Sequence, residues 1–310
     1  MPREPVAKGP IVVGVDGSPE SSIALAWAAK EASVRRAPLR VVHAYLGEQQ
    51  SAADSPTPGP ASAVAGPSLS SSARTVLADA VSEVRGDVPD LDVQGVVAPG
   101  WPVPVLLEES TRAGLLVMGS RALGPVRDVA VGAVSRVVVQ QSSCPVVVVR
   151  ERASRSLPDL RIVVGVDRAS SEDALEFAFD EATRWGAGLT VLHTWTTTPK
   201  ATSRRQRSID SEQRGRAERQ WVDSTLAEWH ERYPDVEVVR NVVEGDPGSQ
   251  LVRLSQNARL LVVGARGRGP VTALVLGSVS MEAVHHAHCP VAVVHRRRIG
   301  NGSSTADPLA

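Results

Sequence analysis

The sequence IVVGVD spans residues 11–16 and occurs again, letter for letter, at residues 162–167. An uninterrupted run of apolar, mostly β-branched residues is typical of a parallel strand that is buried on both faces. The acidic residue that ends each run is then expected at the carboxyl edge of a sheet, where α/β proteins bind ligands. Two identical copies in a chain of 310 residues indicate an internal duplication.

Three further blocks recur in the same order and place the duplication along most of the chain. VVH at 41–43 returns as VLH at 191–193, LLVMG at 115–119 as LLVVG at 260–264, and CPV at 144–146 as CPV at 289–291. We therefore expect two homologous domains, at 1–153 and 159–298. A Pro-, Ala- and Ser-rich insertion at 47–72 interrupts the first domain, and residues 299–310 are expected to form a disordered tail.

Helix signals alternate with the apolar runs in both halves. Ser18 followed by Pro19 is a typical helix start, and Ser171 precedes the matching segment. The residues with helical spacing on one face are Leu25, Ala28, Ala29 and Ala32 in the first half, and Leu175, Ala178, Phe179 and Ala182 in the second. The alternation predicts, in each half, a Rossmann-like α/β domain with a doubly wound parallel sheet.

Composition excludes several function classes. The 34 basic and 34 acidic residues give a formal charge of zero, which argues against nucleic-acid binding through bulk positive charge. Two cysteines are too few for a disulfide scaffold and suit a reducing compartment. The start of the chain lacks the apolar core of a signal peptide, and no apolar run reaches the length of a membrane span. These features predict a cytoplasmic protein without membrane contact.

A glycine-rich segment follows the predicted strand at 260–263. It reads GARGRGP at 264–270, and nine residues separate Gly267 from Gly277 and Ser278, which precede a predicted helix at 279–287. Backbone N–H groups, close-approach glycines and a helix N-terminus together can hold a phosphate. A glycine-rich connection without a ligand explains the same letters. The spacing is neither that of a P-loop nor that of a dinucleotide fingerprint.

Taken together, the repeated VGVD, the G-x-x-G-9-G-S spacing and the closing CPV strand resemble the universal stress protein family, in the tandem-domain form typical of actinobacteria. The resemblance implies a fold of the adenine nucleotide alpha hydrolase type. It also implies a regulatory stress-response protein that binds ATP, ADP or AMP, with magnesium only alongside the nucleotide, and that forms a homodimer. No catalytic residue is implied.

The resemblance also assigns site residues. In the second half, Asp167 would contact the adenosine and the backbone around Val191 would line the adenine pocket. The ribose and phosphates would be held by Gly264, Arg266, Gly267, Gly277 and Ser278. The corresponding residues of the first half are Asp16, Val41, Gly119 and Gly132.

The first half departs from this pattern at two positions. Ala122 stands where the second half has Gly267, and Ala133 stands where it has Ser278. An alanine at a left-handed position costs about 1 kcal/mol, and a lost hydrogen bond to a charged group roughly 1.5–3 kcal/mol. We therefore expect the second site to bind ATP more firmly than the first.

Other functions remain open from the residues alone. A slow ATPase would use the same site, and a non-nucleotide assembly protein would use the glycines only as turns. Asp16 and Asp167 could instead cap helices, and His43 and His193 are expected in the core or a pocket wall. Arg204, Arg205 and Arg207 are expected to be the solvated start of a helix, with an anion or partner contact as the alternative.

Three further expectations concern the end of each half. The HHAHC run at 285–289 contains zinc-ligating residue types, but adjacent histidines on a helix point in different directions, so we expect no metal there. Cys144 and Cys289 are expected to pack as small hydrophobic residues. The last strands, at 146–149 and 291–294, are expected to pair either with each other or with another chain, which would give the homodimer.

Overall fold

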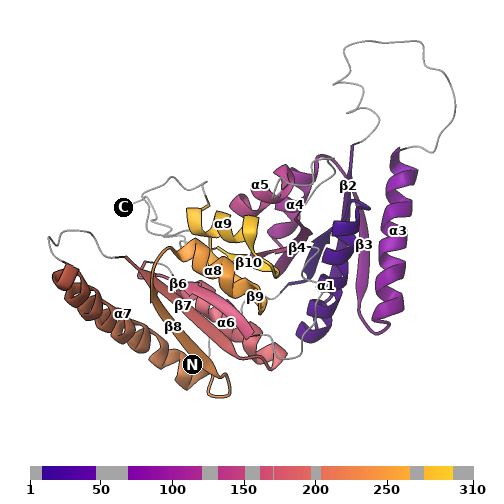
Figure 1. The fold of residues 1–310 in the computed structure, drawn as a ribbon. Helices are drawn as coiled ribbons and strands as arrows, with labels where there is room; N and C mark the ends of the chain where they lie inside the picture. Colours follow the sequence, from indigo (N-terminus) through magenta and orange to yellow (C-terminus); the bar gives the residue numbers. More distant parts are fainter. Residues whose placement is uncertain are drawn as a thin grey trace, which may run out of the picture.

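A computed structural model of the chain describes residues 9–46, 69–120, 132–150, 161–169, 171–196, 204–265 and 276–295. All ten of its strands join in one sheet, with the order β3-β2-β1-β4-β5-β10-β9-β6-β7-β8 (Figure 1). The two halves of the chain supply the two halves of this sheet. The predicted α/β fold with two tandem doubly wound domains is confirmed.

Each half alternates strands and helices in the predicted way. The first half contains β1 (Ile11–Gly14), α1 (Pro19–Arg35), β2 (Leu39–Tyr45), α3 (Leu69–Asp87), β3 (Val93–Pro99), α4 (Pro102–Ser110), β4 (Leu115–Gly119), α5 (Ala133–Gln141) and β5 (Val146–Val149). The second half contains β6 (Arg161–Val166), α6 (Glu172–Trp185), β7 (Leu189–Trp195), α7 (Arg204–Arg232), β8 (Val238–Glu244), α8 (Pro247–Ser255), β9 (Ala258–Gly264), α9 (Ser278–His286) and β10 (Val291–Val294).

The two half-sheets meet at β5 and β10. These strands pair in the antiparallel sense, with Val148 opposite Val291 and Val146 opposite Val293, whereas all other neighbouring strands are parallel. The strands of one half therefore run opposite to those of the other. Of the two alternatives for these strands, pairing within the chain is confirmed. Each of these strands has a neighbour on both sides, so they offer no free edge for a second chain. The homodimer itself stays a prediction.

Helices cover both faces of the sheet. Apolar side chains of α1, α3, α6 and α7 share one buried cluster with the strands, and those of α4, α5, α8 and α9 share a second. The predicted apolar faces of α1 and α6 are confirmed, because Leu25, Ala28, Leu175 and Phe179 are all almost completely buried. The sheet thus has one aliphatic layer above it and one below.

The two predicted helix starts differ in their chemistry. Ser18 is the N-cap of α1 and its hydroxyl accepts a hydrogen bond from the Ser21 amide at 3.2 Å. Ser171 also immediately precedes its helix, α6, but its hydroxyl makes no cap bond. It instead accepts from the Asp167 amide and donates to the Asp167 carbonyl, both at 2.7 Å. The second serine therefore fixes the turn after β6.

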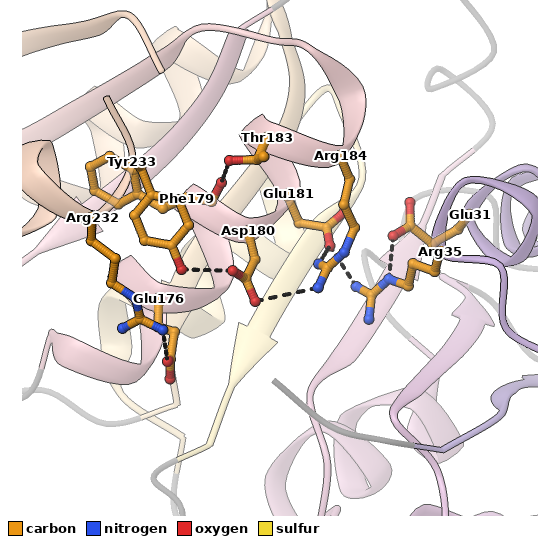
Figure 2. A network of polar contacts seen from close by, with 10 residues as sticks. All are labelled: Glu31, Arg35, Glu176, Phe179, Asp180, Glu181, Thr183, Arg184, Arg232 and Tyr233. Atoms are coloured by element: carbon orange, nitrogen blue, oxygen red, sulfur yellow. Dashed lines mark hydrogen bonds and ion pairs between the residues drawn. The ribbon is translucent and has the colours of Figure 1, made fainter. Parts of the chain in front are cut away.

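Polar side chains cross between the halves where α1 and α6 meet (Figure 2). Arg35 of α1 donates to Glu31 at 2.5 Å on its own helix and to Glu181 of α6 at 2.7 Å. The Trp185 indole donates to Glu31 at 3.0 Å. Both glutamate side chains are completely buried, so this cluster is part of the interior.

On the opposite face, Arg150 follows β5 and donates to the backbone carbonyls of Val284 and His285 in α9. His295 follows β10 and its Nε2 lies 2.8 Å from the carbonyl of Val139 in α5. Each half thus contacts the last helix of the other. Within the described ranges, none of the helices is both long and apolar enough to cross a membrane.

Candidate functional site

The carboxylates that end the repeated IVVGVD blocks lie directly after β1 and β6. Asp167 Oδ1 accepts from the Ala169 amide at 2.7 Å. Asp16 Oδ1 likewise accepts from the amide of Ser18 at 3.0 Å and from its hydroxyl at 2.5 Å. Each aspartate therefore stabilises the turn between its strand and the next helix. Neither caps the helix, because the N-cap residues are Ser18 and Ser171. The same turns place both carboxylates at the carboxyl edges of their half-sheets, where ligand contact was predicted.

In the second half, the end of β9 and the start of α9 lie side by side. The Gly277 amide donates to the Ala265 carbonyl at 3.0 Å, and the Ser280 hydroxyl donates to the Gly264 carbonyl at 2.5 Å. Gly277 is the N-cap of α9 and provides no side-chain cap, and Ser278 is the first helical residue. The N–H groups in the first turn of a helix lack intrahelical partners, so this arrangement can bind an anion.

Three of the predicted ribose and phosphate residues are therefore brought together: Gly264, Gly277 and Ser278. The other two, Arg266 and Gly267, lie outside the described residues.

The first half repeats this backbone geometry. The Gly132 amide donates to the Ser120 carbonyl at 2.9 Å, and the Ser135 hydroxyl donates to the Gly119 carbonyl at 3.0 Å. Helix α5 begins at Ala133, which has no hydroxyl at the position of Ser278. Ala122 lies outside the described residues. The helix start is thus equally placed in both halves, while the second alone has a hydroxyl at this position.

Gly119 also has a packing role. A Cβ atom at this position would lie 2.9 Å from the Glu20 backbone carbonyl oxygen at the start of α1. Real Cβ atoms essentially never approach backbone so closely, so any larger residue must displace α1. This role is independent of any ligand.

Val41 and Val191 lie deeper in their strands than the other predicted site residues. Both are completely buried, and they pair with Val13 and Val164 in the middle of the neighbouring strands. Their side chains belong to the aliphatic core. In β7, the residue that pairs with the end of β6 is His193.

The two histidines match in their backbone contacts. His43 Nδ1 lies 2.8 Å from the Val15 carbonyl, and His193 Nδ1 lies 3.1 Å from the Val166 carbonyl. His193 is buried and His43 is half-buried. The predicted place of His193 in the core is confirmed. That of His43 stays a prediction.

A charged cluster that the sequence did not predict lies beside Asp167. Glu218 of α7 accepts from Arg168 at 2.9 and 3.2 Å, and the same oxygen lies 2.9 Å from His193 Nε2. Arg214 lies 3.7 Å from its other oxygen. Burial raises the pKa of Glu218, but the hydrogen bonds from His193 and Arg168 outweigh it and lower this pKa below the usual range. We call Arg168, His193 and Glu218 the latch, because they hold α7 against the carboxyl edge of β6 and β7.

Nothing equivalent to the latch occurs among the residues of the first half that the structure describes. Gly17 takes the place of Arg168 and adopts φ +80, a left-handed conformation that favours glycine. A Cβ atom there would contact Val76 of α3 at 3.4 Å. In the second half, the Arg168 guanidinium instead lies 4.9 Å from the ring centre of Trp221. The sequence shows that Arg168 replaces a glycine of the first half. It does not show that the partner of Arg168 is Glu218, which lies 50 positions away on α7.

A second difference lies after β3 and β8. The amides of Gly100 and Gly245 donate to the carbonyls of Tyr45 and Trp195 at 2.8 and 3.0 Å, and both glycines have positive φ. In the second half, the next residue is Asp246, which accepts from the Ser249 amide at 2.8 Å and caps α8. In the first half, it is Trp101, which makes no cap bond and is 54% exposed.

Both cysteines pack in the apolar cluster of α4, α5, α8 and α9, as predicted. Burial raises the pKa of Cys144 to about 11 and that of Cys289 to about 12, so both remain thiols at neutral pH. His285 Nε2 lies 3.1 Å from the Met281 sulfur, and burial lowers the pKa of His285. Across the described ranges, no three His, Cys, Asp or Glu side chains gather as metal ligands would.

Comparison with known proteins adds independent information. The model of the universal stress protein family matches residues 9–150 and again residues 160–295. The chain is 36% identical over 297 residues to a universal stress protein of Mycobacterium tuberculosis, covering 92% of this chain and 97% of that protein. It is 35% identical over 304 residues to one of Mycolicibacterium smegmatis, covering 93% and 97%. A solved universal stress protein of Archaeoglobus fulgidus superposes with a TM-score of 0.65 and 19% identity over 93% of this chain and 96% of that one, which shows the fold.

Proposed function

The chain belongs to the universal stress protein family, and from this we propose that it is a regulatory stress-response module that binds an adenine nucleotide. The ligand is ATP, ADP or AMP, bound at the carboxyl edge of each half-sheet. Magnesium accompanies the nucleotide and has no site of its own. The tandem Usp domains provide two such edges in one chain.

One observation carries the proposal. The Gly277 amide bond to Ala265 brings the start of α9 back to the end of β9, with Ser278 at the first helical position. A helix N-terminus beside a strand end favours a phosphate through its N–H groups and its dipole. Asp167 follows β6, the strand that pairs with β9, and its carboxylate is the group proposed to contact the sugar or base.

The two sites are proposed to differ in strength. Ser278 offers a hydroxyl donor that Ala133 lacks, although both helix starts are returned to their strands by equivalent hydrogen bonds. A hydrogen bond to a charged group contributes roughly 1.5–3 kcal/mol, or about 10- to 150-fold in affinity. The second half is therefore proposed to bind the phosphates more firmly than the first.

A binding role fits the described residues better than a catalytic role. The second-half edge contains the buried carboxylate of Glu218, but this group is held by Arg168 and His193 and its pKa is lowered. A carboxylate in that state is a poor general base at neutral pH. Slow ATP hydrolysis at the same site is the second candidate, and a turnover assay with the Ser278→Ala variant tests it. The cytoplasm is the proposed location, since both cysteines are buried free thiols.

Isothermal titration calorimetry of the full chain with ATP tests the function. Ser278→Ala is expected to weaken the tighter site about 10- to 150-fold. Ala133→Ser, the matched change in the first half, is expected to strengthen the weaker site. Two equal sites would overturn the ranking. No binding by the wild type, and no nucleotide released when the purified protein is denatured, would overturn the function and favour the assembly alternative.

A further inference from the structure

Trp101 is the large exposed apolar side chain at the carboxyl edge of the first half. Within the described ranges, the other strongly exposed large hydrophobic residue is Val239. Val239 lies on β8, at the opposite end of the ten-stranded sheet from β3. Trp101 and Val239 therefore do not form one exposed apolar patch.

No structural role explains a tryptophan at this position. Trp101 is the N-cap of α4, where Ser, Thr, Asp and Asn are strongly preferred because they accept from the first N–H groups. The equivalent residue Asp246 makes this bond in the second half. In the first half, α4 thus lacks a side-chain cap and an indole is exposed instead. Conflicts of this kind between local preference and observed residue are concentrated at functional sites.

The backbone holds Trp101 firmly on both sides. Gly100, with φ +136, donates to the Tyr45 carbonyl at the end of β2. Pro102 occupies the first turn of α4, and the Trp101 carbonyl accepts from the Val105 amide at 3.3 Å. Because the backbone is fixed and a tryptophan side chain has only two torsion angles, little conformational entropy is lost when a ligand covers the indole.

The end of β3 and the residues after it are uncharged where the second half is acidic, because Pro99 and Trp101 correspond to Glu244 and Asp246. Tyr45 and Pro99 pair at the ends of β2 and β3, and Trp101 follows two residues later. Gly17, after β1, replaces Arg168 of the latch. Trp101 therefore stands two strands from Asp16 along the same edge, a separation of roughly 10 Å. An adenosine spans about this distance.

We propose that Trp101 stacks on the nucleobase in the first-half site, and that this site recognises the base more than the phosphates. The inference rests on the proposed function and names the recognition mode of one of its two sites. The flat face of an indole binds any planar base by stacking. Ala133 at the start of α5 offers the phosphates one hydrogen bond fewer than Ser278 does. Affinity at this site is thus expected to depend little on the number of phosphates.

Tryptophan fluorescence of the full chain reports on this site directly. The chain has six tryptophans, so the emission of Trp101 is obtained as the difference between the wild type and Trp101→Phe. Adenosine, AMP and ATP are each expected to quench this difference signal, with midpoints within about threefold of one another.

Three variants separate stacking from folding. Trp101→Ala is expected to weaken the first site roughly 5- to 150-fold by calorimetry, while Trp101→Phe retains most of the affinity. Trp101→Asp restores the cap present in the second half. It is expected to raise the melting temperature and still lose the first site, which a merely structural role would not do.

Each outcome bears on the inference separately from the function. Nucleotide binding by calorimetry with unchanged affinity in Trp101→Ala would overturn the role of Trp101 and leave the proposed function standing. A midpoint that tightens steadily from adenosine to ATP would overturn base-dominated recognition. Loss of self-association in Trp101→Asp with unchanged affinity would make Trp101 a protein contact instead. Absence of any nucleotide binding would remove the function and the inference together.

Discussion

Arg35 in α1 donates a hydrogen bond of 2.7 Å to Glu181 in α6 across the two halves, although the two residues are 146 positions apart. Glu31 binds the same guanidinium, so two buried carboxylates converge on one arginine (Figure 2). Burial raises the pKa of Glu181 to about 8, with Arg35 opposing this shift and the charge of Glu31 adding to it. For Glu31, burial is outweighed by Arg35 and by hydrogen bonds, and its pKa is lowered. The two glutamates, Glu31 and Glu181, therefore share one proton at neutral pH.

The proton on Glu181 makes stability depend on pH. The folded state holds it up to about pH 8, whereas the unfolded chain releases it near the ordinary value of 4.5. The contribution of Glu181 is thus fully present below about 4.5 and is lost as the pH rises through about 8. Urea unfolding from pH 6 to 9 should show a free energy of unfolding that falls more steeply in the wild type than in Glu181→Gln. Parallel slopes would contradict a protonated Glu181.

Removal of Arg35 should be strongly destabilising. Arg35→Met leaves Glu31 and Glu181 buried without their shared cation, and breaking a buried pair in this way costs about 3–5 kcal/mol. The matched control is Arg112→Met, because Arg112 forms an exposed pair with Glu108 in which both side chains are more than 70% exposed. That change should stay within about 0.5 kcal/mol by urea unfolding. Similar losses in both variants would mean that the buried cluster contributes no more than a surface pair.

Gly119→Ala should destabilise the fold by about 1–3 kcal/mol, because the added methyl meets the Glu20 backbone at 2.9 Å. Gly86→Ala in α3 is the control, since a Cβ atom there has no neighbour within 4 Å. It should stabilise the protein by about 0.5–1 kcal/mol. Thermal and urea unfolding measure both changes. An unchanged free energy of unfolding in Gly119→Ala would show that α1 moves easily. Because the variant is expected to disturb the fold, it is a poor test of ligand binding.

The latch predicts an effect confined to the second half. Glu218→Ala leaves Arg168 and the buried His193 without their acceptor, at a cost of about 1–3 kcal/mol. The lowered pKa of Glu218 means that its contribution is present above about 4.5 and is lost as the pH falls further.

Amide hydrogen exchange should therefore quicken in α7 and around Asp167 in this variant, with α3 unchanged. Glu212→Ala removes an exposed pair with Arg216 on the same helix and serves as the control. Equal exchange in Glu218→Ala and Glu212→Ala would show that the latch does not fasten α7.

The sequence was informative wherever the two halves agree. Several features occur twice: the IVVGVD block, the apolar helix face of α1 and α6, and the glycine before α5 and α9 that bonds back to the end of β4 and β9. What it missed is what differs between the halves. Glu218 and Trp101 have no counterpart of the same chemistry in the other half, so no repeat marks them. The pairing of β5 with β10 was left open because an apolar edge strand carries no information about which strand it will meet.

The antiparallel pairing of β5 and β10 also determines where the two candidate sites lie relative to each other. Because the strands of the two halves run in opposite directions, the carboxyl ends of β1 and β6, which carry Asp16 and Asp167, also point in opposite directions. Under the proposed function, nucleotides bound at the two edges would therefore lie on opposite sides of the molecule, and neither would contact the other. The ladder of β5 and β10 and the hydrogen bond from Arg35 to Glu181 join the two halves that carry these edges.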